Sequence, residues 1–155
     1  MDKPSAIQSF KDQLQSQHQR ALAAVASAAE GATGDDAKAE SKYDTRGLES
    51  SYLAAGQAEV ADEIARIIGV VERYEFRDFS ETDPIDIGAL VCIDFEGDQD
   101  WYLIAPGGGG GLECTASDGD VATILGPKSP LTQRLSEKKS GETLENSEMK
   151  IVEVR

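Results

Sequence analysis

Acidic side chains gather in one short polar segment of this chain. Asp35, Asp36, Glu40 and Asp44 all lie in the run 34–44. Carboxylate oxygens suit Mg²⁺, which takes one or two protein carboxylates together with water and substrate phosphates. A charged loop is also commonly just solvated, so a hydrophilic turn without further function is the competing interpretation. Carboxylates grouped in this way favour completion of a metal site inside a phosphoryl-transfer partner.

Two stretches with helical periodicity flank this acidic segment, at residues 5–30 and 45–71. Ser5 directly follows a proline and is the expected N-cap of the first helix. Gly31 and Gly34 are expected to end it. The first stretch repeats apolar residues at intervals close to seven: Ile7, Phe10, Leu14, Ala21, Val25 and Ala28. The second carries Leu48, Tyr52, Leu53, Val60, Ile64, Ile67 and Ile68.

Two helices joined by a short polar loop pack antiparallel. We therefore predict a helical hairpin, a coiled coil, over residues 1–76, with its tip at about 31–44. A helix of about 26 residues spans about 39 Å. The acidic tip is thus expected to reach far from the rest of the chain.

Beyond a linker at residues 77–84, the apolar period changes to that of strands. The expected strands are 89–95, 101–105, 112–116, 121–125 and 149–154, with a turn at 96–100. Ser129 and Pro130 open a short helix that is expected to run to about Lys138. Residues 77–155 are predicted to form a small antiparallel sheet domain with one helix, which gives an α+β protein. The glycine run 107–111 lacks the Lys-Ser/Thr of a phosphate loop and is expected to be a mobile turn.

Composition narrows the possible partners. Among 155 residues, 29 acids stand against 15 bases, for a net charge of -14. Phosphate repels such a surface, so unassisted binding to bare nucleic acid is not expected. Residues 78–127 hold eleven acids and no Lys or Arg. Either solubility or an acidic docking face for a basic protein partner explains this stretch.

The two cysteines, Cys92 and Cys114, match neither a disulfide framework nor a zinc pattern. Cys92 lies in an apolar run and is expected in the core. No signal peptide and no span long enough for a membrane is visible, so we expect a cytoplasmic, reduced protein without a membrane partner.

Three features along the chain carry a family resemblance. The first is the acidic hairpin tip that runs from Gly34 to Tyr43. The second is Gly56-Gln57-Ala58, with the apolar helix that follows. The third is Ser129-Pro130-Leu131, about ten residues before Gly141 and ahead of a final strand at 150–154. Together they resemble the Gre family of bacterial transcript cleavage and elongation factors (GreA and GreB). The sequence of residues 42–49 resembles that of a divergent proteobacterial subgroup of that family.

The resemblance implies a coiled-coil N-terminal domain and an FKBP-like C-terminal domain. It implies a transcription factor that is not itself an enzyme and that enters the secondary channel of RNA polymerase. There, tip carboxylates share Mg²⁺ with the polymerase and stimulate cleavage of backtracked RNA. The implied metal contacts are Asp36 and Glu40, supported by Asp35 and Asp44. The implied contacts to the nascent RNA 3′ end are Lys38, Lys42 and Arg46, and those that dock on the polymerase are Ser129, Pro130 and Leu131.

The tip departs from the family pattern, because the Glu expected three residues after Asp36 is replaced by Ala39, and Glu40 comes one place later. A second hypothesis is therefore a channel-binding regulator that does not stimulate cleavage and competes with true cleavage factors. A third is a prolyl isomerase built on the FKBP-like domain. Such a site needs an aromatic-lined pocket, and this domain offers Phe95, Trp101 and Tyr102.

Overall fold

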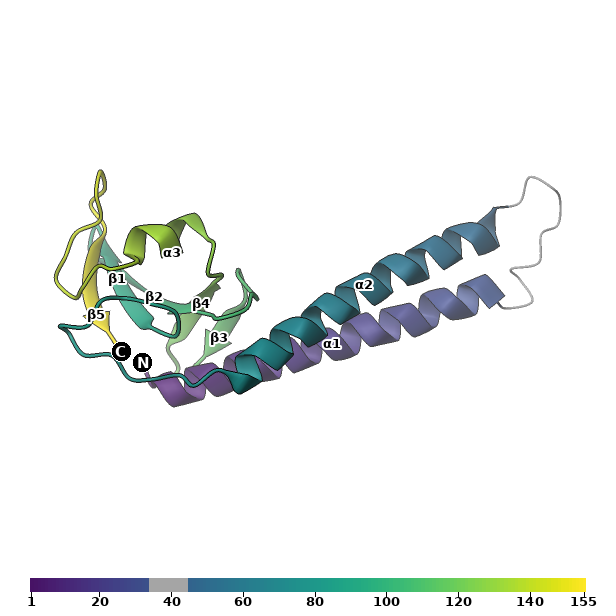
Figure 1. Ribbon diagram of the computed structural model, residues 1–155, viewed down its shortest axis with the longest axis horizontal. Helices are drawn as coiled ribbons and strands as arrows, with labels where there is room; N and C mark the ends of the chain where they lie inside the picture. The colour runs from purple at the N-terminus through teal and green to yellow at the C-terminus, as the bar shows by residue number, and fades with distance from the viewer. Residues whose placement is uncertain (34–44) are drawn as a thin grey trace. The chain divides into compact units, whose positions relative to one another are not determined.

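The computed structural model describes residues 1–33 and 45–155, and its elements follow the predicted order (Figure 1). Two long helices come first, α1 (Lys3–Thr33) and α2 (Arg46–Arg73). The remaining elements are β1 (Leu90–Phe95), β2 (Asp98–Ile104), β3 (Glu113–Thr115), β4 (Val121–Leu125), α3 (Pro130–Leu135) and β5 (Lys150–Val154). The predicted α+β class is confirmed.

Helix α1 begins earlier than predicted, and Asp2 rather than Ser5 caps it. The Asp2 carboxylate accepts a hydrogen bond from the Ser5 backbone N–H at 3.1 Å. The Asp2 carbonyl accepts the first intrahelical bond from Ala6 at 3.1 Å. Either residue type can cap a helix, and Pro4 is tolerated at any position of the first turn, so the local sequence did not discriminate between them. Past Gly31 the helix continues to Thr33.

Contacts divide the chain into two compact units. The sheet unit is Met1–Gln13 together with Ile67–Arg155, and the hairpin unit is Leu14–Arg66. This division differs from the predicted boundary at residue 76, because the ends of both long helices pack with the sheet. In the hairpin unit the buried side chains are mostly small ones: Leu14, Ala21, Ala28 and Ala61. Small residues in a seam let two helix backbones approach closely.

The sheet has the strand order β3-β4-β2-β1-β5. It is mixed, and not purely antiparallel as predicted, because β2 and β4 run parallel, with Trp101 opposite Ala122 and Ile104 opposite Leu125. The chain between them forms β3, which pairs antiparallel with β4 at the edge of the sheet. A parallel pair needs such a crossover connection, and alternation along a single strand does not show which neighbour it will have.

The β1–β2 hairpin closes through a two-residue turn, which is shorter than predicted. Glu96 and Gly97 have φ values of 56° and 96°. Positive φ at both central positions defines the turn type whose twist matches that of paired strands. Phe95 therefore pairs directly with Asp98, and β2 begins at Asp98 instead of Trp101.

One face of the sheet packs against α3 and the segments beside it. Val91 and Ile93 of β1 belong to a single core together with Ile104 of β2 and Leu135 of α3. The other buried members of this core are Phe79, Ile85, Ala89, Leu125, Leu144, Ile151 and Val154. These side chains alternate with those of the opposite sheet face, as the period of two requires.

The opposite face carries a second set of fully buried side chains, Leu90, Leu103 and Ile124. The first turns of α1 run along this side (Figure 1), with Ala6 and Phe10 fully buried. Leu90, Leu103 and Ile124 are thus shielded from water by the beginning of a helix whose later turns belong to the hairpin unit.

Two serines of α1 accept hydrogen bonds from backbone N–H groups at the end of β3 and just beyond it. Ser9 Oγ accepts a hydrogen bond from the Thr115 N–H at 3.0 Å, and Ser5 Oγ accepts one from the Ser117 N–H at 2.8 Å. Four residues of helix advance about 6 Å and two residues of strand about 6.6 Å, so the two spacings match. An edge strand otherwise presents unpaired N–H groups.

Gly107 and Gly108, at the start of the glycine run, are closely packed, a contact that the expectation of a turn did not include. A Cβ at Gly107 would lie 2.8 Å from Val70 Cγ1, and one at Gly108 would lie 2.9 Å from Ile67 Cδ1. The C-terminal turns of α2 therefore sit directly against this backbone, which only glycine allows.

Among the described residues, the model contains no helix whose length and apolar character would let it cross a membrane.

We expect Gly107→Ala to lower the free energy of unfolding by about 1–3 kcal/mol, because its methyl group overlaps Val70 in a packed contact. Urea denaturation followed by circular dichroism measures this. Gly126→Ala is the matched control, since nothing lies within 4 Å of a Cβ at Gly126. Equal stability of the two variants would contradict the packing of α2 on the glycine run.

Candidate functional site

The predicted docking residues lie at the beginning of α3. Ser129 is the N-cap, and its Oγ accepts a hydrogen bond from the Thr132 N–H at 3.1 Å. Pro130 occupies the first helical position, where its missing N–H costs nothing. The sequence prediction of the cap and of the helix start is confirmed, but α3 ends at Leu135 and not near Lys138.

The three predicted docking residues differ in their contacts and in their exposure. The buried Thr132 donates from Oγ1 to the Gly126 carbonyl at 2.8 Å, and this hydroxyl lies 2.8 Å from Ser129 Oγ. Leu131 is half-buried and packs against the core shared by α3 and the sheet. Pro130 is exposed. Ser129 and Leu131 therefore shape this end of α3, whereas Pro130 is the member that presents a surface.

A cavity of about 240 Å³ adjoins α3. It is lined by Ile85, Asp86, Ile87, Ile104, Pro127, Thr132, Gln133 and Ser136. No aromatic side chain is among these lining residues, and Trp101 lies instead under the Arg155 guanidinium, 5.5 Å from its ring centre. This cavity is therefore not the aromatic-lined pocket that the prolyl isomerase hypothesis needs.

Basic side chains return around the end of α3. Arg134 donates to the Glu145 carbonyl at 3.0 Å. Lys138 Nζ lies 3.7 Å from Glu142 and 3.8 Å from Glu145. These pairs are exposed, so each contributes little to stability. This part of the surface is therefore less acidic than the rest of an acidic chain.

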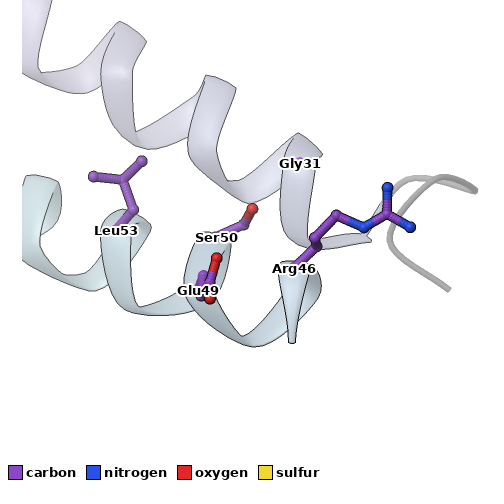
Figure 2. Close-up of a pocket in the computed structure, with 5 residues that line it drawn as sticks. All are labelled: Gly31, Arg46, Glu49, Ser50 and Leu53. Carbon is purple, nitrogen blue, oxygen red and sulfur yellow. The ribbon is translucent and has the colours of Figure 1, made fainter. Parts of the chain in front are cut away.

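The predicted tip residues Asp35, Asp36, Lys38, Glu40, Lys42 and Asp44 lie outside the described residues. The last predicted RNA contact, Arg46, begins α2 and lines a depression of about 430 Å³ with Gly31, Glu49, Ser50 and Leu53 (Figure 2). Within residues 1–33 and 45–155, no three His, Cys, Asp or Glu side chains are grouped closely enough to hold a metal ion.

A Cβ at Gly31 would lie 3.3 Å from Ser50 Oγ. The end of α1 and the start of α2 are therefore adjacent in the hairpin unit, and the eleven residues between them, 34–44, connect the two helices at this end. The acidic segment is thus the connection of a helical hairpin, as predicted.

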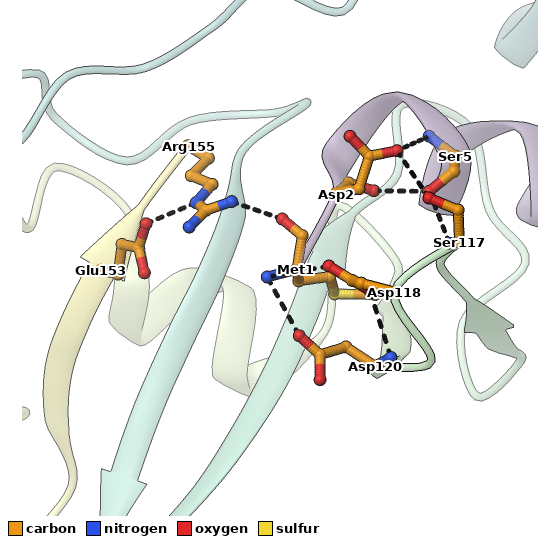
Figure 3. A network of polar contacts seen from close by, with 8 residues as sticks. All are labelled: Met1, Asp2, Ser5, Ser117, Asp118, Asp120, Glu153 and Arg155. Carbon is orange, nitrogen blue, oxygen red and sulfur yellow. Dashed lines mark hydrogen bonds and ion pairs between the residues drawn. The ribbon is translucent and has the colours of Figure 1, made fainter.

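A polar network that the sequence did not reveal anchors the start of α1 in the sheet unit (Figure 3). The Met1 ammonium lies 3.0 Å from Asp120 and 3.4 Å from Asp118. The hydrogen bond to Asp120 raises the pKa of this ammonium. Arg155 binds the Met1 carbonyl at 2.5 Å and also pairs with Glu153.

Lys3 is the buried cation of this region. Its Nζ donates to the carbonyls of Arg77 at 2.5 Å and Arg155 at 2.8 Å, and lies 4.9 Å from the centre of the Phe79 ring. Burial lowers the pKa of the Lys3 ammonium from 10.5 to about 8. A lysine in the first turn of a helix is ordinarily exposed, so no pattern in the sequence indicates this role.

No family model matches the chain, and no curated protein sequence matches it. Similar folds occur among solved structures. The crystal structure of GreA factor homolog 1 (Gfh1) of Thermus thermophilus is 15% identical, with a TM-score of 0.37, and the match covers 94% of each chain. A second structure of the transcription factor Gfh1 is 13% identical, with a TM-score of 0.38, over 95% of this chain and 94% of the other. Thermus aquaticus Gfh1 is 16% identical, with a TM-score of 0.38, over 98% and 95%. Sequence identities and TM-scores this low support neither a family assignment nor a function.

We expect Ser129→Ala to lower the free energy of unfolding by about 1 kcal/mol, because the Thr132 N–H loses its acceptor. Ser129→Asp should retain most of the stability, since aspartate also caps. Ser136→Ala is the control, because the exposed Ser136 contributes its backbone N–H to the Thr132 carbonyl and keeps that bond. Thermal or urea unfolding measures these differences. An unchanged free energy of unfolding in Ser129→Ala would show that the cap does not stabilise the protein.

The lowered pKa of Lys3 predicts an alkaline rise in stability. Between about pH 8 and 10.5 the folded chain has released a proton that the unfolded chain still holds, so the free energy of unfolding increases with pH over this window. Relative to Lys3→Met or the permanently charged Lys3→Arg, the wild-type chain should gain up to about 3 kcal/mol from pH 7.5 to 10.5. The free energy of unfolding is measured by urea titration at each pH. The same pH dependence in all three proteins would refute the lowered pKa of Lys3.

Proposed function

We propose that this chain is a transcription factor that binds RNA polymerase through its secondary channel and stimulates cleavage of backtracked RNA. The observation that carries the proposal is the hairpin unit, in which two long helices meet at an acidic connection, residues 34–44. From Leu14 to Thr33 alone, α1 extends about 30 Å. A paired-helix element of this length suits delivery of carboxylates into another molecule. Such a factor acts in the cytoplasm.

In this proposal the sheet unit docks on the polymerase through the start of α3. The Ser129 cap and the packed Leu131 hold the helix end in one geometry, and the exposed Pro130 meets the partner. A rigid docking element loses little conformational entropy on binding, which favours affinity.

The tip residues act by position and charge. Asp36 and Glu40 provide carboxylate oxygens to Mg²⁺ of the polymerase active centre, with Asp35 and Asp44 adding negative charge nearby. The bound ion supplies Lewis-acid stabilisation and a more acidic water. Lys38, Lys42 and Arg46 are placed along the chain to attract the phosphates of the RNA 3′ end. The chain is then no enzyme by itself, because the reacting groups belong to the polymerase.

The tip spacing supports a second candidate function, a regulator that occupies the channel without stimulating cleavage. Ala39 stands where an Asp-x-x-Glu arrangement would have its second acid, and Glu40 comes one place later. A shift of one residue changes the separation and direction of two carboxylates, and metal coordination tolerates little error. Such a regulator would dock through the same α3 surface and displace an authentic cleavage factor.

Replacing Asp36 and Glu40 together by Ala should abolish stimulated cleavage while polymerase binding is retained, because the helices and α3 are unchanged. Cleavage is measured on a stalled elongation complex with labelled RNA, and binding by fluorescence anisotropy. Glu30→Ala is the control, since Glu30 is an exposed acid of α1 outside the tip.

Two outcomes separate the candidates. Full cleavage by the double variant would remove Asp36 and Glu40 from the mechanism. Wild-type chain that binds the polymerase, leaves the RNA uncut and displaces an authentic factor would favour the non-cleaving regulator.

A further inference from the structure

Helix α2 carries large apolar side chains that the hairpin unit leaves in water. Leu48, Tyr52, Gly56 and Val60 follow one another at four-residue intervals and therefore form one stripe along the helix. Tyr52 is 71% exposed, Leu48 55% and Val60 49%. Leu53, beside the stripe, is 57% exposed and lines the depression in Figure 2. We call Leu48, Tyr52, Gly56 and Val60 the α2 stripe.

The α2 stripe lies away from the seam between the two helices. The side chain of α2 that the seam buries most is Ala61, which is 3% exposed. A Cβ at Gly56 would meet nothing within 4 Å, so the middle of the stripe is open. Within the hairpin unit, α2 thus buries the methyl group of Ala61 most fully and exposes a phenol ring and branched side chains, whereas an amphipathic helix usually turns its large apolar side chains inward. Contiguous exposed apolar side chains mark interaction surfaces.

Acidic side chains border the α2 stripe. Glu59 is exposed next to Val60, and Glu49 accepts a hydrogen bond from Thr45 Oγ1 at 3.0 Å. Glu63 forms a two-point pair with Arg66, at 2.6 and 2.8 Å. No basic side chain in the described part of the chain pairs with Glu49 or Glu59. The charge beside the stripe is therefore available to a partner.

The acidic side chains beside the α2 stripe discriminate between two possible binding partners, a second copy of the chain and a basic surface. A second copy of the chain would bring Glu49 and Glu59 against their equivalents, and each copy has a net charge of -14. Like charges across an interface oppose association. A surface with apolar side chains bordered by Lys or Arg complements both the stripe and its border.

We propose that the α2 stripe is a second contact surface for the polymerase, matched to a wall that presents apolar side chains flanked by basic ones. This inference rests on the proposed function and adds a site on the hairpin unit, whereas α3 belongs to the sheet unit. Tyr52 supplies a rigid aromatic anchor, and aromatic residues are typical of binding hot spots. Gly56 lets the partner approach the helix backbone between Tyr52 and Val60, and Glu59 steers and orients the encounter.

The test measures binding of the full chain to bacterial RNA polymerase core enzyme by fluorescence anisotropy. Tyr52→Ser with Val60→Ser should weaken binding about tenfold or more, because both exposed side chains lose their burial in the complex. Val121→Ser is the matched control, since Val121 is 47% exposed in the sheet unit and its loss should leave affinity unchanged. Circular dichroism confirms that each variant folds, which is expected because the replaced side chains are in water.

Gly56 offers a second, independent variant pair. Gly56→Trp should block the approach of the partner and weaken binding, while the smaller Gly56→Ala should change the affinity little. A Cβ at Gly56 meets nothing within 4 Å, and both replacements favour the helix over glycine, so neither should unfold the unit. Glu59→Lys should slow association and reduce its dependence on salt.

Each outcome has one reading. Binding by the wild-type chain that the stripe variants and Gly56→Trp leave unchanged would overturn the stripe and keep the proposed function. No binding by the wild-type chain would overturn the proposed function and this inference with it. A dimer of the chain that the stripe variants abolish, seen by analytical ultracentrifugation, would assign the stripe to a second copy instead.

Discussion

The sheet unit depends on the seating of the first turns of α1 against the sheet. Two hydroxyls one helical turn apart, on Ser5 and Ser9, accept the N–H groups of an edge that would otherwise be open. On the same segment, Phe10 is fully buried and Lys3 holds two backbone carbonyls that lie far apart in the chain. An apolar contact and two kinds of polar contact thus act on about two turns of helix. Removal of this segment would expose one sheet face and leave the N–H groups of Thr115 and Ser117 without these acceptors.

In the hairpin unit, small side chains are buried and large apolar ones are exposed. Its seam is built largely from alanines such as Ala21, Ala28 and Ala61, which bury little apolar area. Tyr52 and Leu53, which could have stabilised a thicker seam, point instead to solvent. A slender pair of helices results, with a close seam inside and an exposed apolar stripe outside, and both features are compatible with the proposed entry into the channel of a partner. The same composition would be a liability in a protein that acts alone.

Helix α3 shows how a short element can be well defined. Six residues are too few for a helix to be stable by itself, so its order comes from tertiary contacts. Ser129, Pro130 and Thr132 close its N-terminal end, and Leu135 inserts into the core. The Ser-Pro-Leu motif is thus a structural device first, and the surface that it presents follows from that rigidity.

Local patterns were sufficient for much of this architecture. Helical spacing of apolar residues predicted both long helices, with a near seven-residue repeat in the first. A strand-type period predicted the strands, and Ser129-Pro130 predicted the start of α3. The parallel pairing of β2 with β4 was missed because a strand pattern contains no information about a non-local neighbour. The close packing of Gly107 and Gly108 was not predicted, because the side chains that approach them, Val70 and Ile67, come from α2 about 40 residues earlier. The roles of the tip acids stay predictions from sequence.

The sequence by itself determined the elements, their order and the acidic connection of the hairpin, since these follow from propensity and from periods of 3.6 and 2. Only the tertiary structure decided which chemistry becomes buried and which stays available. It enclosed Lys3 among carbonyls, placed Ser5 and Ser9 on a strand edge and left Tyr52 in water. The physical reason is that burial and hydrogen-bond pairing depend on segments far apart in the chain, and no local pattern records them.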